Sequence, residues 1–299
     1  MLIQSYLHPD LSVVRDVRAL EAVCHAHDGL SGTLFLDPSL NFSPELPCLF
    51  TLREGEETVS LLTFFVPTQA EAELVGMTHP AHRGKGYFRA LVRAAAEFAR
   101  KYGVADLLFV CEPHSAAGVK AVSSFGARLD HTEYSLRYNP LQSDARLTVL
   151  DGLALREATA GDLGDMSAVA SAAFSEPAEQ ARHFLVKSLE APDRTQYVAH
   201  LNGEPAGVGA IGLEDGEATI FGLAVLPVFQ GRGVGRGMVS LMLNELLSRD
   251  TKGILIEVDS TNLPALHLYR SCGFEPEATY GYYRAPLPQV EKLLAEGRV

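Results

Sequence analysis

The sequence predicts two tandem copies of one α/β or α+β domain. Three observations support this fold class: a repeat within the chain, alternating strand-like and helix-like segments in each copy, and a length of 299 residues, which suffices for two domains of ordinary size. The repeat carries the most weight, because a duplicated unit decides the organisation of the whole chain.

The repeat has a constant offset of 147 residues. The segments THPAHRGKGYF (78–88) and VLPVFQGRGVG (225–235) each precede a helical pattern, and Pro80 in the first matches Pro227 in the second. Two further pairs keep this offset: Gly126 with Gly273, and Arg137 with Arg284. Because surface loops tolerate insertions easily, one offset over roughly sixty residues indicates a duplicated domain.

Each copy shows the same order of expected elements. In the second copy, residues 195–212 read as two strands joined by a turn at Asn202-Gly203. A buried strand then ends at Pro227, and an amphipathic helix, a strand over 253–260, a short helix and a last strand follow. We therefore expect an N-terminal domain at 1–140, a linker at 141–150 and a C-terminal domain at 151–299.

Composition and charge narrow the class of protein. The net charge is −12, both halves are acidic, and no basic run exists that could follow a phosphate backbone, so we expect no nucleic-acid partner. The four cysteines lack the spacing of a metal site. No apolar run reaches membrane-spanning length, and the opening residues carry charges, so we expect a cytoplasmic protein with no membrane partner.

The segment FQGRGVGRGMVSL (229–241) is unusually rich in glycine for the start of a helix. A strand, a tight glycine turn and a helix N-terminus together form an anion site, because unpaired backbone N–H groups and the helix dipole attract negative charge. No Lys-Ser/Thr follows the last glycine, so the segment is not a P-loop, and the Rossmann glycine pattern does not fit either. The remaining alternative is a turn whose glycines serve packing alone.

Two motifs resemble the GCN5-related N-acetyltransferase (GNAT) family. Gln230-x-x-Gly233-x-Gly235 resembles the signature Q/R-x-x-G-x-G/A, which cradles the pyrophosphate of coenzyme A in that family. The segment NLPALHLYRSCGFEP (262–276) resembles the family's element N-x-x-A-x-x-L-Y-x-x-x-G-F. The resemblance covers the second copy fully and the first partially. It implies two tandem GNAT-like domains, each with a mixed, mostly antiparallel sheet flanked by helices.

The resemblance also implies a reaction and a binding site. An amine would attack the thioester of acetyl-CoA directly in a ternary complex, with acetyl-CoA as cosubstrate and no metal. The thioester and pantetheine would lie along the strand that ends at Val225, bonded to backbone N–H groups. The implied cofactor-binding residues are Leu223, Ala224, Val225, Gln230, Gly231, Arg232, Gly233, Val234, Gly235, Arg236, Asn262 and Tyr269.

Two side chains are candidates for proton transfer. Tyr269 is the candidate general acid for the leaving thiolate, with a packing role on its short helix as the alternative. Glu257 interrupts the apolar strand ILIEVD and is the candidate general base, acting directly or through water, although a solvated strand-end residue is an equal alternative. Glu217, at the start of the preceding strand, is the second candidate for the base.

The first copy lacks these side chains. At the 147-residue offset, Glu257, Asn262 and Tyr269 are replaced by Val110, Ser115 and Val122. A possible second cofactor loop remains at Arg83, Gly84, Lys85 and Gly86, although Phe88 stands where the last glycine would be. We expect this domain to be a scaffold or a degenerate binder. An active domain that uses other groups, such as Glu71, Glu73 or His114, is the alternative.

The functional expectation is an acetyl-CoA-dependent N-acetyltransferase whose active site lies in the second copy. The alternatives are a non-catalytic acyl-CoA-binding or regulatory module and a transferase for longer acyl groups. The acceptor is a small-molecule or peptide amine that the sequence does not identify, and the sequence does not specify the oligomeric state.

Overall fold

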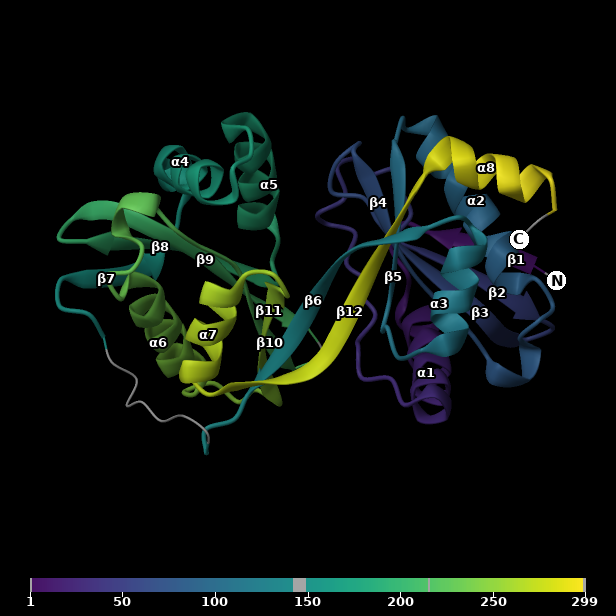
Figure 1. The fold of residues 1–299 in the computed structure, drawn as a ribbon, viewed down its shortest axis with the longest axis horizontal. Helices are drawn as coiled ribbons and strands as arrows, with labels where there is room; N and C mark the ends of the chain where they lie inside the picture. Colours follow the sequence, from purple (N-terminus) through teal and green to yellow (C-terminus); the bar gives the residue numbers. More distant parts are fainter. Residues whose placement is uncertain (1, 142–148, 215, 298–299) are drawn as a thin grey trace. The chain divides into compact units, whose positions relative to one another are not determined.

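The computed structural model describes residues 2–141, 149–214 and 216–297 and divides into two compact units (Figure 1). Unit 1 comprises Met1–Glu133 together with Ala278–Val299, and unit 2 comprises Tyr134–Glu277. Each unit has a mixed, mostly antiparallel sheet with helices on both faces, which confirms the predicted fold class. No helix among the described residues is both long and apolar enough to span a membrane.

Unit 1 has the strand order β1-β2-β3-β4-β5-β12. Strands β4 and β5 run parallel, whereas β1 with β2, β2 with β3, β3 with β4 and β5 with β12 are antiparallel. Its elements are β1 (Leu2–Tyr6), α1 (Leu11–Asp28), β2 (Leu49–Glu54), β3 (Glu57–Phe65), β4 (Glu71–Thr78), η1 (Pro80–His82), α2 (Tyr87–Lys101), β5 (Asp106–Cys111), α3 (Ala116–Ser124), the first part of β6 (Arg128–Tyr138), the second part of β12 (Phe274–Pro286) and α8 (Leu287–Ala295).

Helices cover both faces of the unit 1 sheet. Helix α1 begins after Asp10, whose carboxylate accepts N–H groups from Ser12 and Val13, and ends at Gly29 in the left-handed conformation. Its buried apolar side chains, Val17, Leu20 and Cys24, pack on one face of the sheet, whereas α2 and α8 pack on the other. The core of unit 1 is therefore two layers of apolar side chains, one on each side of the strands.

Unit 2 has the strand order β6-β11-β10-β9-β8-β7. Here β10 and β11 form the parallel pair. Its elements are β7 (Leu153–Glu157), η2 (Ala160–Asp162), α4 (Leu163–Phe174), α5 (Ala178–Glu190), β8 (Arg194–Leu201), β9 (Glu204–Glu214), β10 (Glu217–Val225), η3 (Pro227–Phe229), α6 (Val234–Leu246), β11 (Gly253–Asp259) and α7 (Leu263–Ser271), together with the second part of β6 and the first part of β12.

The sequence patterns of unit 2 form the elements that they predict. Asn202 and Gly203 both have positive φ, at 53° and 89°, as a two-residue hairpin turn requires, and they join β8 to β9. Along α6, Val234, Met238 and Met242 are buried against the sheet. Helices α6 and α7 pack on one face of this sheet, and α4 and α5 pack on the other.

Two strands run from one unit into the other. Strand β6 begins in unit 1 and ends in unit 2, whereas β12 begins in unit 2 and ends in unit 1, where residues 281–286 pair with residues 106–111 of β5. The compact units therefore divide the chain at different residues from the expected boundaries at 140 and 151. Most of the expected linker, residues 142–148, lies outside the described residues. The assignment of domains from the repeat itself stays a prediction.

Helix α8 follows unit 2 in the chain but packs into the core of unit 1, so we expect it to contribute to the stability of unit 1. Leu287 at the start of α8 is only 4% exposed and belongs to the core of unit 1. We expect Leu287→Ala to lower the free energy of unfolding of unit 1 by about 2–5 kcal/mol, because it leaves a cavity. Urea denaturation followed by hydrogen exchange of unit 1 peptides measures this loss. The matched control is Leu263→Ala, which removes a side chain that is 66% exposed and which we expect to change stability by less than about 0.5 kcal/mol. An equal effect of both variants would contradict the assignment of α8 to unit 1.

Candidate active site

The parallel strands of unit 2 separate at the place where the thioester was expected. Strand β10 pairs with β11 from Glu217 to Ile220, and the described residues beyond this point are no longer in register. At the same place β10 has a bulge against β9 between Phe221 and Ala224, and Gly222 has a φ of 59°. The expected thioester strand, Leu223 to Val225, therefore lies beside a gap in the sheet, where backbone N–H groups can face a ligand.

Two glycines in left-handed conformation shape the loop that follows. Gly231 and Gly233 have φ values of 71° and 86°, and no atom lies within 4 Å of a Cβ built on either residue. Gly233 precedes the first residue of α6, and no side chain caps that end of the helix. The N–H groups of the first turn thus face outward, as an anion-binding helix terminus requires. The glycines are needed for backbone conformation, and the space around them is open.

The loop of unit 1 has the same conformation at the 147-residue offset. Gly84 and Gly86 have φ values of 76° and 81°, and Gly86 precedes the first residue of α2 without a side-chain cap. The residue that opens each loop has the same contact in both units. Gln230 Nε2 donates to Val225 O at 3.0 Å, and Arg83 Nε donates to Thr78 O at 3.1 Å. The Gln/Arg position therefore ties the loop to the end of its strand.

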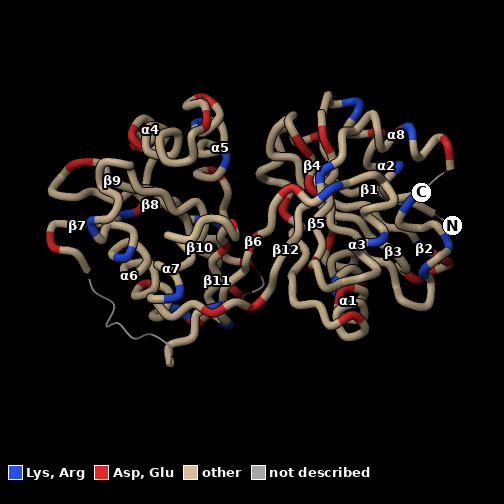
Figure 2. The backbone as a smooth tube through the Cα atoms, in the orientation of Figure 1, with Lys and Arg blue, Asp and Glu red and all other residues tan. Residues whose placement is uncertain are grey.

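The two arginines of the unit 2 loop, Arg232 and Arg236, both contact other side chains of unit 2. Arg232 stacks over the Phe229 ring at 5.8 Å from its centroid, and Arg236 Nη2 donates to Ser271 Oγ at 2.6 Å. The second contact ties the first turn of α6 to the end of α7. Over both units, Lys and Arg positions are scattered among Asp and Glu positions (Figure 2).

Tyr269 is buried on α7, where it is 5% exposed and packs against Phe274. Burial raises the pKa of its phenol to about 12. Its hydroxyl makes no hydrogen bond with any residue that the structure describes. Asn262 begins this helix, with its side-chain oxygen accepting Ala265 N–H at 3.2 Å. The structure thus shows a capping contact for Asn262 that orients the helix carrying Tyr269.

The two candidates for the base lie in different surroundings. Ile256 and Val258 on β11 are buried in the same core as Tyr269, so the exposed Glu257 between them faces the opposite side of the sheet. Glu217 lies at the other end of β10 from Val225, and its Oε1 is 2.8 Å from Arg137 Nη2. Glu257 therefore lies on the strand that separates from β10, whereas Glu217 belongs to an ion pair away from the gap.

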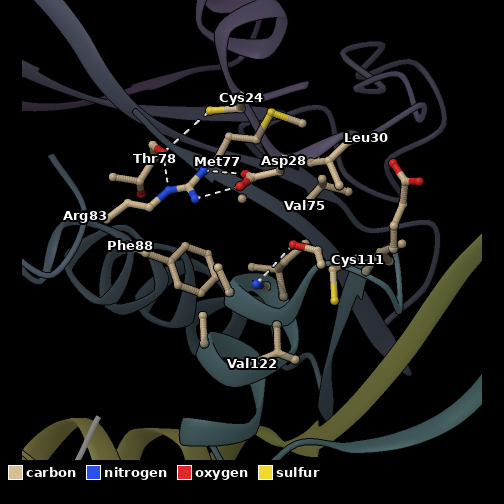
Figure 3. Close-up of a pocket in the computed structure, with 18 of the residues that line it drawn as sticks. Cys24, Asp28, Leu30, Val75, Met77, Thr78, Arg83, Phe88, Cys111 and Val122 are labelled. Atoms are coloured by element: carbon tan, nitrogen blue, oxygen red, sulfur yellow. Dashed lines mark hydrogen bonds and ion pairs between the residues drawn. The ribbon is translucent and has the colours of Figure 1, made fainter. Parts of the chain in front are cut away.

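Unit 1 contains a cavity of about 650 Å³ at its own glycine loop (Figure 3). Strands β4 and β5 pair in parallel only as far as Leu74 and Phe109, and the cavity opens beyond that point. The expected loop residues Arg83, Gly84 and Gly86 line it, as do the three residues that replace the candidate catalytic groups, Val110, Ser115 and Val122. Sequence reasoning did not predict a cavity of this size in the copy without those groups.

Unit 1 has a phenylalanine where the loop of unit 2 has its last glycine, and a glycine on the neighbouring strand makes room for it. Phe88 stands at the position of Gly235, and its ring occupies the space that a Cβ on Gly76 of β4 would need. Gly76 stands at the position of Leu223 in turn, so the large residue has moved from the strand to the helix. The Phe88 ring packs edge-on against Phe125. The core beside the cavity thus stays filled although its residues differ from those of unit 2.

Asp28 fixes the unit 1 loop from a distant part of the chain. This last residue of α1 receives both terminal nitrogens of Arg83, with Nη1 2.9 Å from Oδ1. The Arg83 guanidinium holds the pKa of Asp28 at about 2, well below the usual value for aspartate. Sequence reasoning missed Asp28, because nothing in the motif indicates a partner 55 residues earlier in the chain.

The comparisons with known proteins agree with the repeat. The sequence model of the acetyltransferase (GNAT) family matches the chain twice, at residues 15–126 and at residues 164–274. The chain is 29% identical over 226 residues to a mycothiol acetyltransferase from Clavibacter sepedonicus, covering 72% of each chain. A shorter stretch of 63 residues, 21% of this chain and 42% of the relative, is 44% identical to the ribosomal protein bS18-alanine N-acetyltransferase from Salmonella typhimurium.

Solved structures share the fold at low sequence identity. A GCN5-related N-acetyltransferase from Sphaerobacter thermophilus superposes with a TM-score of 0.74 at 16% identity, over 96% of this chain and 95% of the other. A tandem GNAT protein from the clavulanic acid biosynthesis pathway superposes with a TM-score of 0.70 at 18% identity, over 96% and 99%.

The pairing of Asp28 with Arg83 predicts a pH-dependent contribution to stability. A carboxyl with a lowered pKa stabilises the fold above its unfolded pKa of about 3.9, and this stabilisation is lost as the pH falls toward about 2. We expect Asp28→Asn to lower the unfolding free energy by about 1–2 kcal/mol at pH 7 and to have no effect near pH 2. Denaturant titrations of both proteins across this range measure the difference.

The matched control for this titration is Asp16→Asn on the same helix, whose carboxylate is 3.9 Å from Arg15 Nη2 at the surface. We expect this variant to behave like the wild type at every pH. A difference between wild type and Asp28→Asn that stayed constant down to pH 2 would contradict the role of the charge.

Proposed function

Because the chain belongs to the acetyltransferase (GNAT) family and carries two regions of that family, we propose that it uses acetyl-CoA to acetylate a primary amine in unit 2. The observation that carries this proposal is the arrangement along β10: a bulged strand leaves its parallel neighbour directly before an uncapped, glycine-rich helix terminus. This arrangement offers a gap for a thioester and a positive backbone terminus for a pyrophosphate.

The cosubstrate would lie along β10 with its phosphates on the loop. Gly231, Gly233 and the first turn of α6 would hold the pyrophosphate by backbone N–H groups, and backbone N–H groups near Leu223, Ala224 and Val225 would polarise the thioester carbonyl. The hydrogen bonds that Gln230 and Arg236 donate to other parts of unit 2 support this proposal, because they hold the loop and the first turn of α6 in place. The remaining implied residues, Arg232, Val234, Gly235 and Asn262, would shape the rim of the site.

The amine would attack from the side of the sheet that Glu257 faces. Glu257, directly or through water, would take the proton of the attacking nitrogen, and the carbon–sulfur bond would break to release the thiolate of coenzyme A. We favour Glu257 over Glu217 as the base, because Glu257 lies on β11 beyond the last paired residues, whereas Glu217 lies at the other end of β10 from the gap. The acid and base candidates would then act from opposite faces of the sheet.

The raised pKa of Tyr269 refines its proposed role. With a phenol pKa of about 12 and a thiol pKa of about 8.5, full proton transfer to the thiolate would be unfavourable by about 5 kcal/mol. A hydrogen bond from the phenol to the developing thiolate has no such penalty and stabilises the negative charge as it forms. We therefore propose Tyr269 as the donor that stabilises the leaving group.

A second function fits unit 1. Its cavity adjoins a loop of the same conformation, but Val110 and Val122 replace the base and the phenol. We propose that unit 1 binds acyl-CoA without transferring the acyl group. The acceptor of unit 2 is a small-molecule or peptide amine, in keeping with the acceptors in the relatives' names, and we propose that the reaction takes place in the cytoplasm.

Binding of acetyl-CoA tests where the cofactor lies. We expect calorimetric titration of the intact chain to show two sites, with Gly233→Asp abolishing one and Gly86→Asp the other, because a carboxylate at either loop repels the pyrophosphate. The control is Gly55→Asp, at another glycine of positive φ with open space around it, which should bind like the wild type. A single site lost with Gly233→Asp would refute cofactor binding by unit 1, and an absence of binding would refute the whole proposal.

Kinetics test the two side chains. A panel of amines identifies an acceptor by release of the coenzyme A thiol, with mass spectrometry of the product. We expect Glu257→Gln to lower kcat by about 10²–10⁴-fold and Tyr269→Phe by about 10–100-fold, as for a lost hydrogen bond to a charged group. Glu217→Gln should keep kcat near that of the wild type. Loss of activity in Glu217→Gln with full activity in Glu257→Gln would reverse the assignment of the base.

A further inference from the structure

The cavity of unit 1 contains a buried carboxylate that the proposed function does not use. Glu112 directly follows β5, is 6% exposed and lines the cavity. Its Oε1 accepts two backbone N–H groups, from Ser31 at 2.8 Å and Gly32 at 3.0 Å. These contacts hold the segment after α1 against the end of the strand. They orient the carboxylate but do not neutralise its charge.

No lysine or arginine among the described residues contacts this carboxylate. The nearest basic atom is His114 Nδ1, 3.9 Å from Oε2 on a side chain that is 54% exposed. His114 Nε2 lies 3.0 Å from Gly29 O, so a neutral ring that donates there has no proton on Nδ1. Two other acidic side chains of unit 1, Asp28 and Glu21, each contact an arginine. A buried charge without such a partner is costly, and a cationic ligand would remove that cost.

An aromatic ring lies at the same segment. Tyr280 of β12 also lines the cavity, and its ring is so close to Gly32 that a Cβ there would be 2.5 Å from it. Glu112 and Tyr280 therefore both contact Gly32, one through a backbone N–H and the other through its ring. A carboxylate beside an aromatic ring is a pair of groups that attracts an ammonium ion, by charge and by cation–π interaction.

The rest of the wall is mostly apolar, and its other charged side chains are Asp28, Arg83, Arg89 and Lys120. In Figure 3, Leu30 and Cys111 lie at one end of the cavity wall, and Arg83 and Phe88 lie at the other. The end near Glu112 is thus separate from the glycine loop. His25 also lines the cavity, and its Nε2 is buried without a hydrogen-bond partner. Apolar walls with a few polar atoms of this kind are typical of small-molecule sites.

We propose that the cavity of unit 1 binds a small amphipathic amine, whose ammonium is held by Glu112 beside Tyr280. The apolar part of the ligand packs against the wall between Leu30 and Cys111. Binding at this site involves no covalent step and does not depend on acetyl transfer by unit 2. A metal ion fits less well, because the described residues contain no group of three His, Cys, Asp or Glu side chains that could hold one. An anion at the Glu112 end of the cavity, away from the glycine loop, is repelled by the carboxylate.

The test uses two probes that differ in one group. 2-Phenylethylamine and 2-phenylethanol share their apolar body, but only the amine is charged at pH 7. We expect calorimetric titration of the full chain without acetyl-CoA to show the amine binding at least about tenfold more tightly than the alcohol. Glu112→Gln keeps the acceptor for Ser31 and Gly32 N–H but removes the charge, so its affinity for the amine should fall to that for the alcohol. Glu57→Gln, an exposed carboxylate on β3, is the matched control and should bind like the wild type.

Several outcomes would overturn the proposal. These are equal binding of amine and alcohol by the wild type, undiminished binding of the amine by folded Glu112→Gln, and an absence of binding by either probe. If circular dichroism shows that Glu112→Gln does not fold, Tyr280→Leu replaces it, with a several-fold loss of amine affinity expected and little change for the alcohol. Amine binding that is lost in Glu257→Gln but kept in Glu112→Gln would place the amine in unit 2 and refute a site in unit 1.

Discussion

The separation of two parallel strands is the constraint on which the rest of each unit depends. Parallel neighbours exchange hydrogen bonds along their length, so the point where they diverge exposes backbone groups that need another partner. In unit 2 this point follows Ile220, and in unit 1 it follows Leu74. The glycine loop and a helix terminus without a side-chain cap follow it in both units, so the proposed ligand in the gap would have backbone N–H groups at the helix terminus as partners.

One architecture is compatible with the different chemistry proposed for the two units, because few side chains take part in forming the loop. The loops agree in backbone conformation at Gly84, Gly86, Gly231 and Gly233, and each is tied to its strand by its first residue. Replacement of Glu257 and Tyr269 by valines leaves this backbone unchanged. Unit 1 thus keeps the conformation of the loop and lacks the groups proposed for transfer. The core beside the site stays filled, because the large Phe88 on the helix packs into the space above Gly76 on the strand.

The sequence was sufficient for the features that are local in the chain. The Asn202-Gly203 turn and the start of α6 after the glycines depend on a few neighbouring residues, and the structure has both of them. It was insufficient where distant residues meet. Asp28 on Arg83, Glu112 on Gly32 and the return of the last strand to unit 1 depend on packing between segments with no common pattern. The roles of the catalytic and cofactor-binding residues stay predictions, because these residues would act on acetyl-CoA and on the amine, and their roles depend on contacts with those two ligands.

The exchanged strands have a consequence for how the protein is made. Strand β5 of unit 1 is complete by Cys111, but its neighbour β12 contributes residues 281–286, which a ribosome adds only after all of unit 2. The first half of the chain therefore leaves the ribosome with one edge of its sheet open while the whole second half is synthesised. Unit 2, whose residues are contiguous in the chain, is released in nearly complete form. A chain that ended before residue 281 would therefore lack the residues that pair with β5, and unit 1 would be the unit left incomplete.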